Sequence, residues 1–377
     1  MKKILAICAS LLLTAGAMSA QELANFNVGG RGARVVSPEI QGDSVTFRLR
    51  ADYATMVRLS GSWMENPYGA GEEMRRVANN VWEYKCPLPS PEIYTYNFIV
   101  DGVAVNDPLN IQVQRDGTRF LNMLIVPGKR TENYGEANQR GTVKYMWYDS
   151  QSLGLNRRMV VYTPYGYENN PKQKYPVLYL LHGGGGDEEA WTSMGRAAQI
   201  LDNLIEKGLA KPMIVVMPNG NPGQQAAATL NLPTKQATGQ NAYVNSLVKE
   251  IIPFVEKNFR AIPNRSARAI AGLSMGGGHT LSATALYPGT FDYICPLSIG
   301  SQRSEQLDQQ LQGIKKAGYK LYWFGCGESD FLWESAKQLD AALTANGLEH
   351  TFFVTDGGHT WANWRNYLNT FAQLLFK

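Results

Sequence analysis

The sequence is poor in histidine and cysteine. Its 377 residues include only four of each. The cysteines that follow the N-terminal segment, Cys86, Cys295 and Cys326, contain no CxxC pair and accompany no histidine-rich spacing, so we expect neither a disulfide framework nor a metal site. Charged residues make up 18% of the chain, and its net charge of +4 is not gathered into a basic run. This distribution argues against a nucleic-acid partner.

Long apolar runs are also scarce, and the clearest one stands at the N-terminus. Lys2 and Lys3 precede an apolar stretch over residues 4–13, and small residues follow as far as Ala20. This layout predicts a signal peptide over residues 1–20, cleaved after Ala17 or Ala20. The stretch is about half the roughly 20 residues that a membrane-spanning helix needs. We therefore expect export to the periplasm or the extracellular space, with no membrane span after cleavage.

Residues 21–126 have the pattern of an all-β domain. Short strands separated by turns are predicted over residues 44–49, 56–59, 81–84, 93–100 and 120–126. In the fourth of these, Tyr94, Tyr96, Phe98 and Val100 alternate with other residues, and the dipeptide Asp101-Gly102 that follows suits a tight hairpin turn. The pattern predicts a small immunoglobulin-like β-sandwich with an aromatic inner face.

A polar segment over residues 127–141 is predicted as a linker, and an α/β domain follows over residues 142–377. Apolar strands alternate with helical stretches there, at residues 177–181, 214–217, 267–271, 293–297, 321–324 and 351–354. Fully apolar strands are typical of a parallel sheet that helices cover on both faces. Residues 221–240 lack periodicity and are predicted as a long surface loop.

The pentapeptide from Gly272 to Gly276 matches GxSxG with Ser274 at its centre. It follows an apolar strand and precedes a helical stretch, which is the context of a nucleophile elbow. A serine hydroxyl needs a base, and His359 lies in the loop after the last strand, where this topology delivers its histidine. We therefore predict that Ser274 is the nucleophile and His359 the general base.

The acid that orients the histidine is expected in the loop after the penultimate strand. Asp330 is the prediction, with Glu328 and Asp356 as competitors. The chain order serine, aspartate, histidine agrees with an α/β-hydrolase. Two backbone N–H groups must bind the oxyanion, and we predict Met275 and Gly184, the latter within the glycine run after His182. That run lacks the lysine and hydroxyl residue of a phosphate-binding loop.

With these motifs placed, the region from Gly141 to Lys377 resembles the esterase D-like superfamily, especially carbohydrate esterase family 1 and its feruloyl esterases. The segments that carry the resemblance are YPVLYLLHGGGGDEEAW, KPMIVVMPNG, ARAIAGLSMGGGHT, GCGESDF and GGHTWANW. The resemblance implies an α/β-hydrolase whose triad falls on Ser274, Asp330 and His359 and whose oxyanion donors fall on Gly184 and Met275.

The N-terminal part resembles a family 48 carbohydrate-binding module, through VRLSGSW and YTYNFIVDGVAVNDP. Such modules stack sugars on exposed aromatic rings. A binding pair of tryptophans is not found in this sequence, because Trp63 and Trp82 are equally suited to a core or an interface. The domain could instead pack against the esterase and shape its entrance.

The resemblance implies hydrolysis of ester-linked hydroxycinnamates, such as ferulate on arabinoxylan, without a metal or organic cofactor. An acetyl xylan esterase, a siderophore esterase of the enterochelin type and an acyltransferase stay open as alternatives. A noncatalytic glycan-binding protein is the alternative of a different class. Residues predicted to line the substrate pocket are Trp191, Asn219 and Trp361, together with the loop over 221–240.

Overall fold

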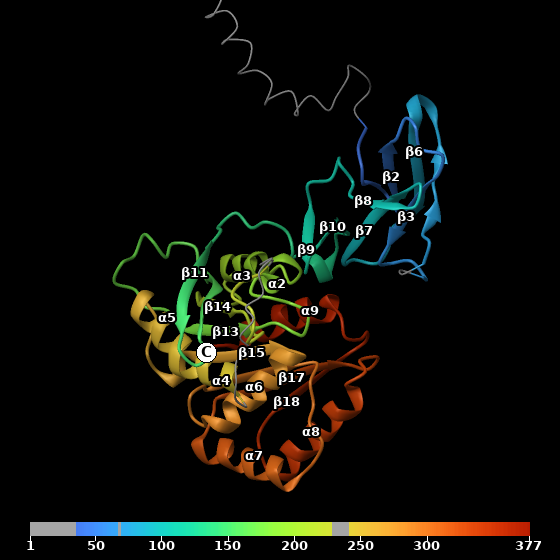
Figure 1. Ribbon diagram of the computed structural model, residues 1–377. Helices are drawn as coiled ribbons and strands as arrows, with labels where there is room; N and C mark the ends of the chain where they lie inside the picture. The colour runs from blue at the N-terminus through green and yellow to red at the C-terminus, as the bar shows by residue number, and fades with distance from the viewer. Residues whose placement is uncertain (1–34, 67–68, 228–240) are drawn as a thin grey trace, which may run out of the picture.

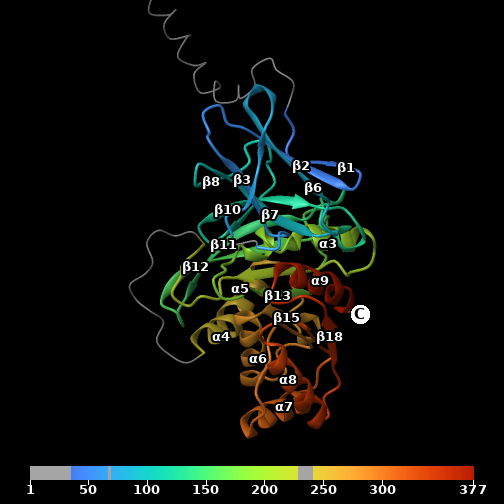
Figure 2. The same cartoon turned by 90° about the vertical axis from the view of Figure 1, so that its right-hand side faces the viewer.

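The computed structural model describes residues 35–66, 69–227 and 241–377. The predicted signal peptide and residues 228–240 of the predicted loop lie outside the described residues. Two small antiparallel sheets lie on top of a larger α/β part, as two perpendicular views show (Figures 1 and 2). Among the described residues, no helix has the length and apolar character needed to span a bilayer.

The upper part of the molecule consists of two sheets from the first third of the chain. One has the order β1-β2-β6-β5, and the other has the order β4-β3-β7-β10-β9, with β8 paired to β7. Their bounds are β1 Glu39–Gln41, β2 Ser44–Arg50, β3 Val57–Gly61, β4 Glu72–Glu73, β5 Arg75–Arg76, β6 Val81–Pro87, β7 Ile93–Val100, β8 Val103–Val105, β9 Val113–Asp116 and β10 Arg119–Ile125, with a 3₁₀ turn at Ala78–Asn80. The predicted strands therefore lie where the sequence pattern indicated.

Aromatic residues from both sheets form a shared core, and this makes the pair a sandwich. Phe47 of β2 packs edge-on against Tyr96 of β7 and stacks on Trp63, with ring centroids 4.8 and 5.4 Å apart. The hairpin between β7 and β8 turns at Asp101 and Gly102, whose φ angles of 46° and 89° are those of the turn that the dipeptide predicted. We call these two sheets the sandwich.

The lower part is built on an eight-stranded sheet with the order β11-β12-β14-β13-β15-β16-β17-β18. From β14 to β18 all neighbours are parallel, whereas β11 and β12 are antiparallel to their neighbours. The strands are β11 Thr142–Ser150, β12 Leu155–Thr163, β13 Val177–Leu181, β14 Ile214–Pro218, β15 Arg268–Leu273, β16 Tyr293–Leu297, β17 Leu321–Gly327 and β18 Thr351–Thr355. Sequence reasoning missed β11 and β12. Val143, Tyr145 and Trp147 of the edge strand β11 are exposed, so no continuous apolar run marks it.

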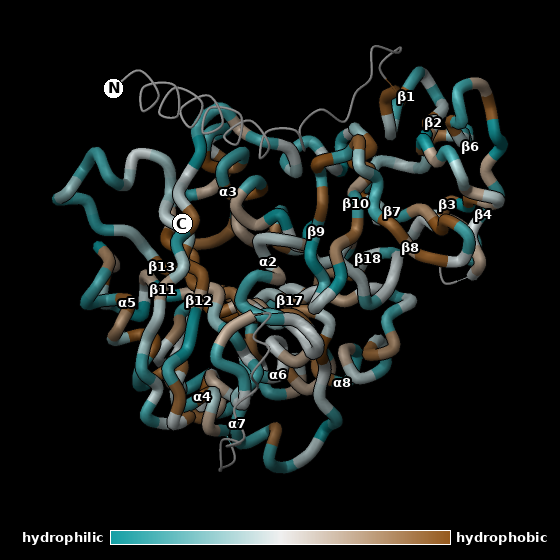
Figure 3. The backbone as a smooth tube through the Cα atoms, turned by 45° about the horizontal axis from the view of Figure 1, so that its top comes forward, coloured by the Kyte–Doolittle hydropathy of each residue, from teal (hydrophilic) through white to brown (hydrophobic). Residues whose placement is uncertain are grey.

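Helices cover both faces of this sheet. Their bounds are α2 Ala190–Ser193, α3 Ala197–Glu206, α4 Ala242–Ser246, a π-helical turn at Leu247–Ile251, α5 Ile252–Asn258, α6 Met275–Leu286, α7 Glu305–Ala317, α8 Trp333–Ala345 and α9 Trp361–Phe371, with 3₁₀ turns at Lys129–Thr131, Arg265–Ala267 and Ala372–Leu374. Alternate residues of β13 enter opposite cores: Leu178 and Leu180 pack with α3 and α9, whereas Val177 and Tyr179 pack with α5. Hydrophobic segments accordingly concentrate in the strands and hydrophilic ones in the outer loops (Figure 3).

The segment over residues 127–141, predicted as a linker, packs closely onto the α/β part. The ring of Tyr134 is fully buried. The backbone carbonyl oxygen of the same residue accepts a hydrogen bond of 3.0 Å from the Arg196 guanidinium. The Asn133 amide donates to the Asn369 side chain at 2.8 Å. The polar composition of this segment predicted a linker exposed to solvent. The buried ring of Tyr134 instead anchors the segment to the α/β part.

We expect Tyr134→Ala to destabilise the protein by about 3–5 kcal/mol, because truncation of a buried aromatic side chain leaves a cavity. The measurement is the shift in melting temperature, followed by circular dichroism. Tyr53→Ala is the matched control, since Tyr53 is 97% exposed and its loss should change stability by less than about 0.5 kcal/mol. Equal shifts for the two variants would contradict the packed arrangement of the segment.

Candidate active site

Ser274 occupies a strained turn between β15 and α6. Its φ and ψ angles are 53° and −115°, a conformation that is costly for a residue with a side chain. The glycines on either side make the turn possible. A Cβ on Gly272 would lie 2.4 Å from the Gly276 carbonyl oxygen, and one on Gly276 would lie 2.6 Å from that of His182. The GxSxG spacing therefore follows from steric contact inside the turn.

His359 and Asp330 meet across two neighbouring loops. The Nδ1 atom of His359 lies 3.0 Å from both carboxylate oxygens of Asp330. A carboxylate only accepts hydrogen bonds, so the proton of the neutral ring is on Nδ1 and Nε2 is left as the acceptor. Gly327 allows the loops to approach, because a Cβ there would lie 2.2 Å from the Gly357 carbonyl oxygen.

The Asp330 carboxylate is inaccessible to solvent and remains charged. Burial pushes its pKa upward, but the hydrogen bond with His359 and the N–H of Leu332 at 2.9 Å outweigh this effect, and the net pKa lies below its ordinary value. The two competing acids, Glu328 and Asp356, are exposed. Asp330 is thus the acid that hydrogen-bonds to the histidine.

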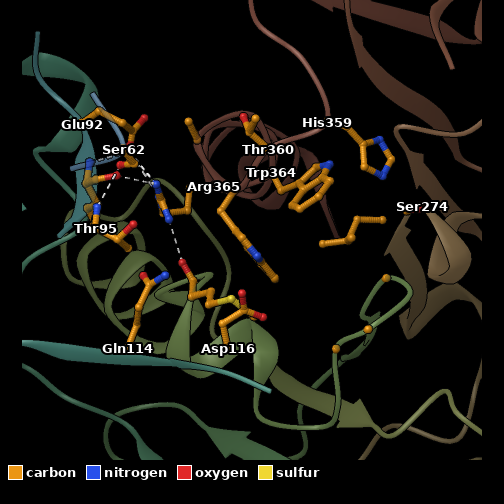
Figure 4. A pocket seen from close by; sticks show the side chains of 18 of the residues that line it. Ser62, Glu92, Thr95, Gln114, Asp116, Ser274, His359, Thr360, Trp364 and Arg365 are labelled. Carbon is orange, nitrogen blue, oxygen red and sulfur yellow. Dashed lines mark hydrogen bonds and ion pairs between the residues drawn. The ribbon is translucent and has the colours of Figure 1, made fainter. Parts of the chain in front are cut away.

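Two aromatic rings contact His359. The Trp364 ring meets it edge-on with centroids 5.0 Å apart, and the Phe331 ring is tilted against it with centroids 4.4 Å apart. The Trp364 indole N–H donates to the Ser298 hydroxyl at 2.9 Å and is fixed by it. Ser274 and His359 line the same cavity, although neither of these two described side chains hydrogen-bonds the other (Figure 4). Such bonds are often long before substrate binds.

A glycine loop over residues 183–186 forms the wall beside Ser274. His182 fixes its start, since the ring Nδ1 lies 2.8 Å from the Gly183 carbonyl oxygen and Nε2 accepts the Gly220 N–H at 2.7 Å. A Cβ at Gly183 would lie 2.4 Å from the end of the Leu273 side chain, which would have to shift. Gly184 lines the cavity, and Met275 begins α6 directly after Ser274. Of the two predicted oxyanion donors, Met275 thus adjoins Ser274 in the chain and Gly184 lines the same cavity.

The cavity has a volume of about 560 Å³ and lies between the sandwich and the α/β part. Figure 4 shows Ser274 and His359 on one side and Ser62 and Thr95 on the opposite side. The sandwich contributes Ser62, Glu92, Ile93, Tyr94, Thr95, Gln114 and Asp116, and the α/β part adds Met194, Trp361, Trp364 and Arg365 to the residues already described. One end of the cavity thus carries Ser274 and His359, and the other is lined by polar residues of the sandwich.

The three predicted pocket residues have different positions. Trp361 lines the cavity, whereas Trp191 and Asn219 are not among the described residues that line it. Trp191 is buried, and its indole N–H donates to the Leu181 carbonyl oxygen at 2.9 Å. The Asn219 side chain donates to Glu188 at 3.0 Å. Both support the segments that carry the glycine loop.

Sequence reasoning missed the sandwich side of the cavity and the ion pair beneath it. Arg365 of α9 donates to Glu92, just before β7, at 2.9 Å, and to the Met194 carbonyl oxygen at 2.8 Å. The partners are 273 residues apart in the chain. No local pattern marks such a pair. Within the described residues, no group of three or more histidine, cysteine or acidic side chains is arranged to hold a metal ion.

Comparison with known proteins gives a consistent result for the α/β part. The family model described as "Putative esterase" matches residues 150–374. An endo-1,4-beta-xylanase/feruloyl esterase of Xylanibacter ruminicola is 32% identical over 314 residues, which are 81% of this chain and 42% of that protein. The chain thus spans less than half of this relative's length.

Solved structures match a similar share of the chain, and some of them cover more of it. A ferulic acid esterase aligns with a TM-score of 0.53 and 27% identity, over 62% of this chain and 98% of its own. The enterobactin esterase of Shigella flexneri aligns with a TM-score of 0.62 and 18% identity, over 88% and 92%. These matches confirm the predicted α/β-hydrolase class. The family match begins at residue 150 and leaves the sandwich outside it.

We expect His279 of α6 to make stability depend on pH. Burial, with a smaller effect of nearby His182, lowers its pKa from 6.5 to about 4, so the folded protein keeps this ring neutral. Between these two pH values the unfolded chain binds a proton that the folded chain does not. The free energy of unfolding therefore decreases as the pH is lowered, by at most roughly 3 kcal/mol. His279→Phe, which keeps a ring against Tyr243, should reduce the drop in melting temperature between pH 7.5 and pH 4.5. An unchanged drop would contradict this assignment.

Proposed function

The chain belongs to the Putative esterase family of carboxylic ester hydrolases, and on that basis we propose that it cleaves hydroxycinnamoyl esters, such as ferulate on arabinoxylan. The observation that carries the proposal is the convergence of Ser274, the Asp330–His359 pair and the glycine loop on one cavity. A nucleophile, a base with its orienting acid, and backbone donors are the parts that acyl transfer requires.

In the proposed mechanism, the Ser274 hydroxyl attacks the ester carbonyl while Nε2 of His359 takes its proton. The tetrahedral intermediate collapses, and the same proton leaves with the alcohol, which is the sugar hydroxyl. An acyl-enzyme remains. Water then attacks it while His359 takes a proton from the water; the ring returns this proton to the Ser274 oxygen as the acyl–oxygen bond breaks, and the hydroxycinnamic acid is released. Asp330 keeps the ring oriented and stabilises its positive charge during each transfer.

The Gly184 and Met275 N–H groups are the proposed oxyanion donors. Met275 stands at the N-terminus of α6, so the helix dipole adds to the stabilisation of negative charge. Each donor of this kind lowers the barrier by about 3–4 kcal/mol.

Several observations support a plant polysaccharide as the substrate. The relative from Xylanibacter ruminicola joins xylanase and feruloyl esterase in its name. Aromatic residues beside the serine, among them Trp361 and Trp364, suit a hydroxycinnamoyl ring, and the polar sandwich side suits sugar hydroxyls. In this proposal residues 1–20 direct export, residues 21–126 form a carbohydrate-binding-module-like domain joined by residues 127–141, and residues 142–377 form the esterase.

A siderophore ester is the second candidate. The enterobactin esterase shares the fold over 88% of this chain, a span longer than the α/β part. Its likeness concerns architecture, whereas the likeness to the xylanase/feruloyl esterase includes sequence. We therefore place the hydroxycinnamoyl ester first and test both. Acetylated xylan belongs in the same test, because an acetyl esterase of Caldicellulosiruptor saccharolyticus is 25% identical over 229 residues.

The mature protein should release ferulate from methyl ferulate and from feruloylated arabinoxylan. Ser274→Ala should lower turnover by roughly 10⁵–10⁶-fold, because the nucleophile is lost. Free ferulate, acetate and 2,3-dihydroxybenzoyl products are followed by chromatography, with acetylated xylan and enterobactin as the competing substrates. Acetate or siderophore release without ferulate would replace the substrate, and ferulate release that persists in Ser274→Ala would overturn the mechanism.

Asp330→Asn should lower kcat by about 10³–10⁴-fold with little change in KM, because an amide no longer fixes the histidine tautomer or stabilises the imidazolium. Asp356→Asn is the matched control and should retain activity within about twofold, since Asp356 is an exposed acid of the neighbouring loop, the one that carries His359. Initial rates with methyl ferulate distinguish them. The reverse ranking would assign the orienting role to Asp356.

A further inference from the structure

Arg115 of β9 reaches from the sandwich to the segment that follows the glycine loop. Its guanidinium binds the Asp187 carboxylate with two parallel hydrogen bonds of 2.8 Å and reaches Glu189 at 3.2 Å. The Arg115 side chain is 11% exposed and that of Asp187 is 9%. Strand β9 and helix α2 are in contact, and Figures 1 and 3 show them side by side. This is a planar, buried, charge-assisted contact, which fixes orientation as well as distance.

The three acidic residues 187–189 are all held by neighbouring elements. Glu188 accepts from Arg158 of β12 at 2.6 Å and from Asn219 at 3.0 Å. Arg158 also donates to Glu189. The segment over residues 187–189 is therefore held on one side by residues of the α/β part. On the other side, Arg115 supplies the anchor from the sandwich.

The glycine loop has few contacts of its own between these anchors. His182 fixes its beginning, the Gly186 N–H donates to the Gly183 carbonyl oxygen at 3.2 Å, and Asp187 follows directly. At Gly184, a Cβ would meet no atom within 4 Å. The end of the loop is held by the Asn221 side chain, which donates to the Gly186 carbonyl oxygen at 2.7 Å, and by Arg115 through Asp187. The position of Gly184 therefore depends on where the two ends of the loop are held.

We propose that Arg115 is a positioning residue of the esterase reaction: by holding Asp187, the sandwich keeps the Gly184 N–H aimed at the oxyanion. This inference rests on the proposed function, in which Gly184 is an oxyanion donor. It assigns the sandwich a part in turnover that is separate from glycan binding. A donor displaced by about 1 Å costs on the order of 10²-fold in rate.

Other contacts keep the two parts together when the guanidinium is removed. The Ser193 hydroxyl accepts from the Arg115 backbone N–H at 2.7 Å and donates to its carbonyl oxygen at 3.1 Å. The Arg365–Glu92 pair forms a second junction. A substitution that changes only the Arg115 side chain therefore removes the sandwich's contact with the Asp187 carboxylate, which still accepts the Glu189 N–H at 3.0 Å, while β9 remains docked.

The test compares Arg115→Gln with the wild type in kinetics with methyl ferulate. We expect kcat to fall by about 10–100-fold with KM within about twofold, since the loss is in transition-state stabilisation. Arg115→Lys, which keeps the charge without the fork, should lie between the two. Asp187→Asn should match Arg115→Gln, and the double variant should be scarcely worse than either, because both remove one interaction.

Arg48→Gln is the control, because Arg48 forms partly buried ion pairs with Glu39 and Glu83 inside the sandwich. It should leave kcat unchanged. Hydrogen exchange of the peptide over residues 183–190 gives a readout that needs no activity, and it should quicken in Arg115→Gln alone. A kcat within twofold of the wild type for Arg115→Gln, or an equal loss in Arg48→Gln, would overturn the proposal.

The proposed function can fail without deciding this inference. If the wild type cleaves no ester, or if Ser274→Ala is fully active, the esterase mechanism is wrong, whereas hydrogen exchange still decides whether Arg115 restrains the glycine loop. Unchanged hydrogen exchange in Arg115→Gln would show that Arg115 does not restrain the glycine loop, and it overturns the proposal. Faster exchange with unaltered kcat shows that this restraint exists and does not serve the reaction, which also overturns the proposal.

Discussion

The steric constraint at the turn between β15 and α6 determines the arrangement of the site. Ser274 keeps a φ of 53° although it is not a glycine. The chain on both sides of it is packed so closely that Gly272 and Gly276 leave no room for side chains. The close approach of Gly276 to the His182 carbonyl oxygen also sets the distance between the serine and the neighbouring loop. One local contact thus fixes two parts of the candidate oxyanion site at once.

The other parts of the site lie in segments that charged side chains hold in place. Asp330 holds the histidine from β17, and Glu92 holds α9, which begins two residues after that histidine. Asp187 holds the other wall. The cavity is therefore a joint product of the sandwich and the α/β part. A module bound only by a flexible linker would not supply these contacts.

The sequence predicted the elements that have a local signal. The strands at 93–100, 177–181 and 293–297 have the predicted bounds, and the turn around Ser274 has the predicted strand–helix context. The catalytic roles of Ser274, Asp330 and His359 remain predictions. The Arg115–Asp187 contact joins residues 72 positions apart, so neither pattern nor spacing reveals it. The orientation of Trp191 could not be predicted for a related reason, since proximity to a motif does not determine which way a ring points.

The burial of the ion pairs between the sandwich and the α/β part has a consequence for ionic strength. The side chains of Arg115, Asp187, Arg365 and Glu92 are each no more than 11% exposed, so dissolved ions cannot come between the partners. At 1 M salt the Debye length is about 3 Å, and exposed pairs such as Lys144–Glu168 lose most of their attraction. We therefore expect the Arg115–Asp187 and Arg365–Glu92 pairs to hold the two parts together at salt concentrations that screen surface charges.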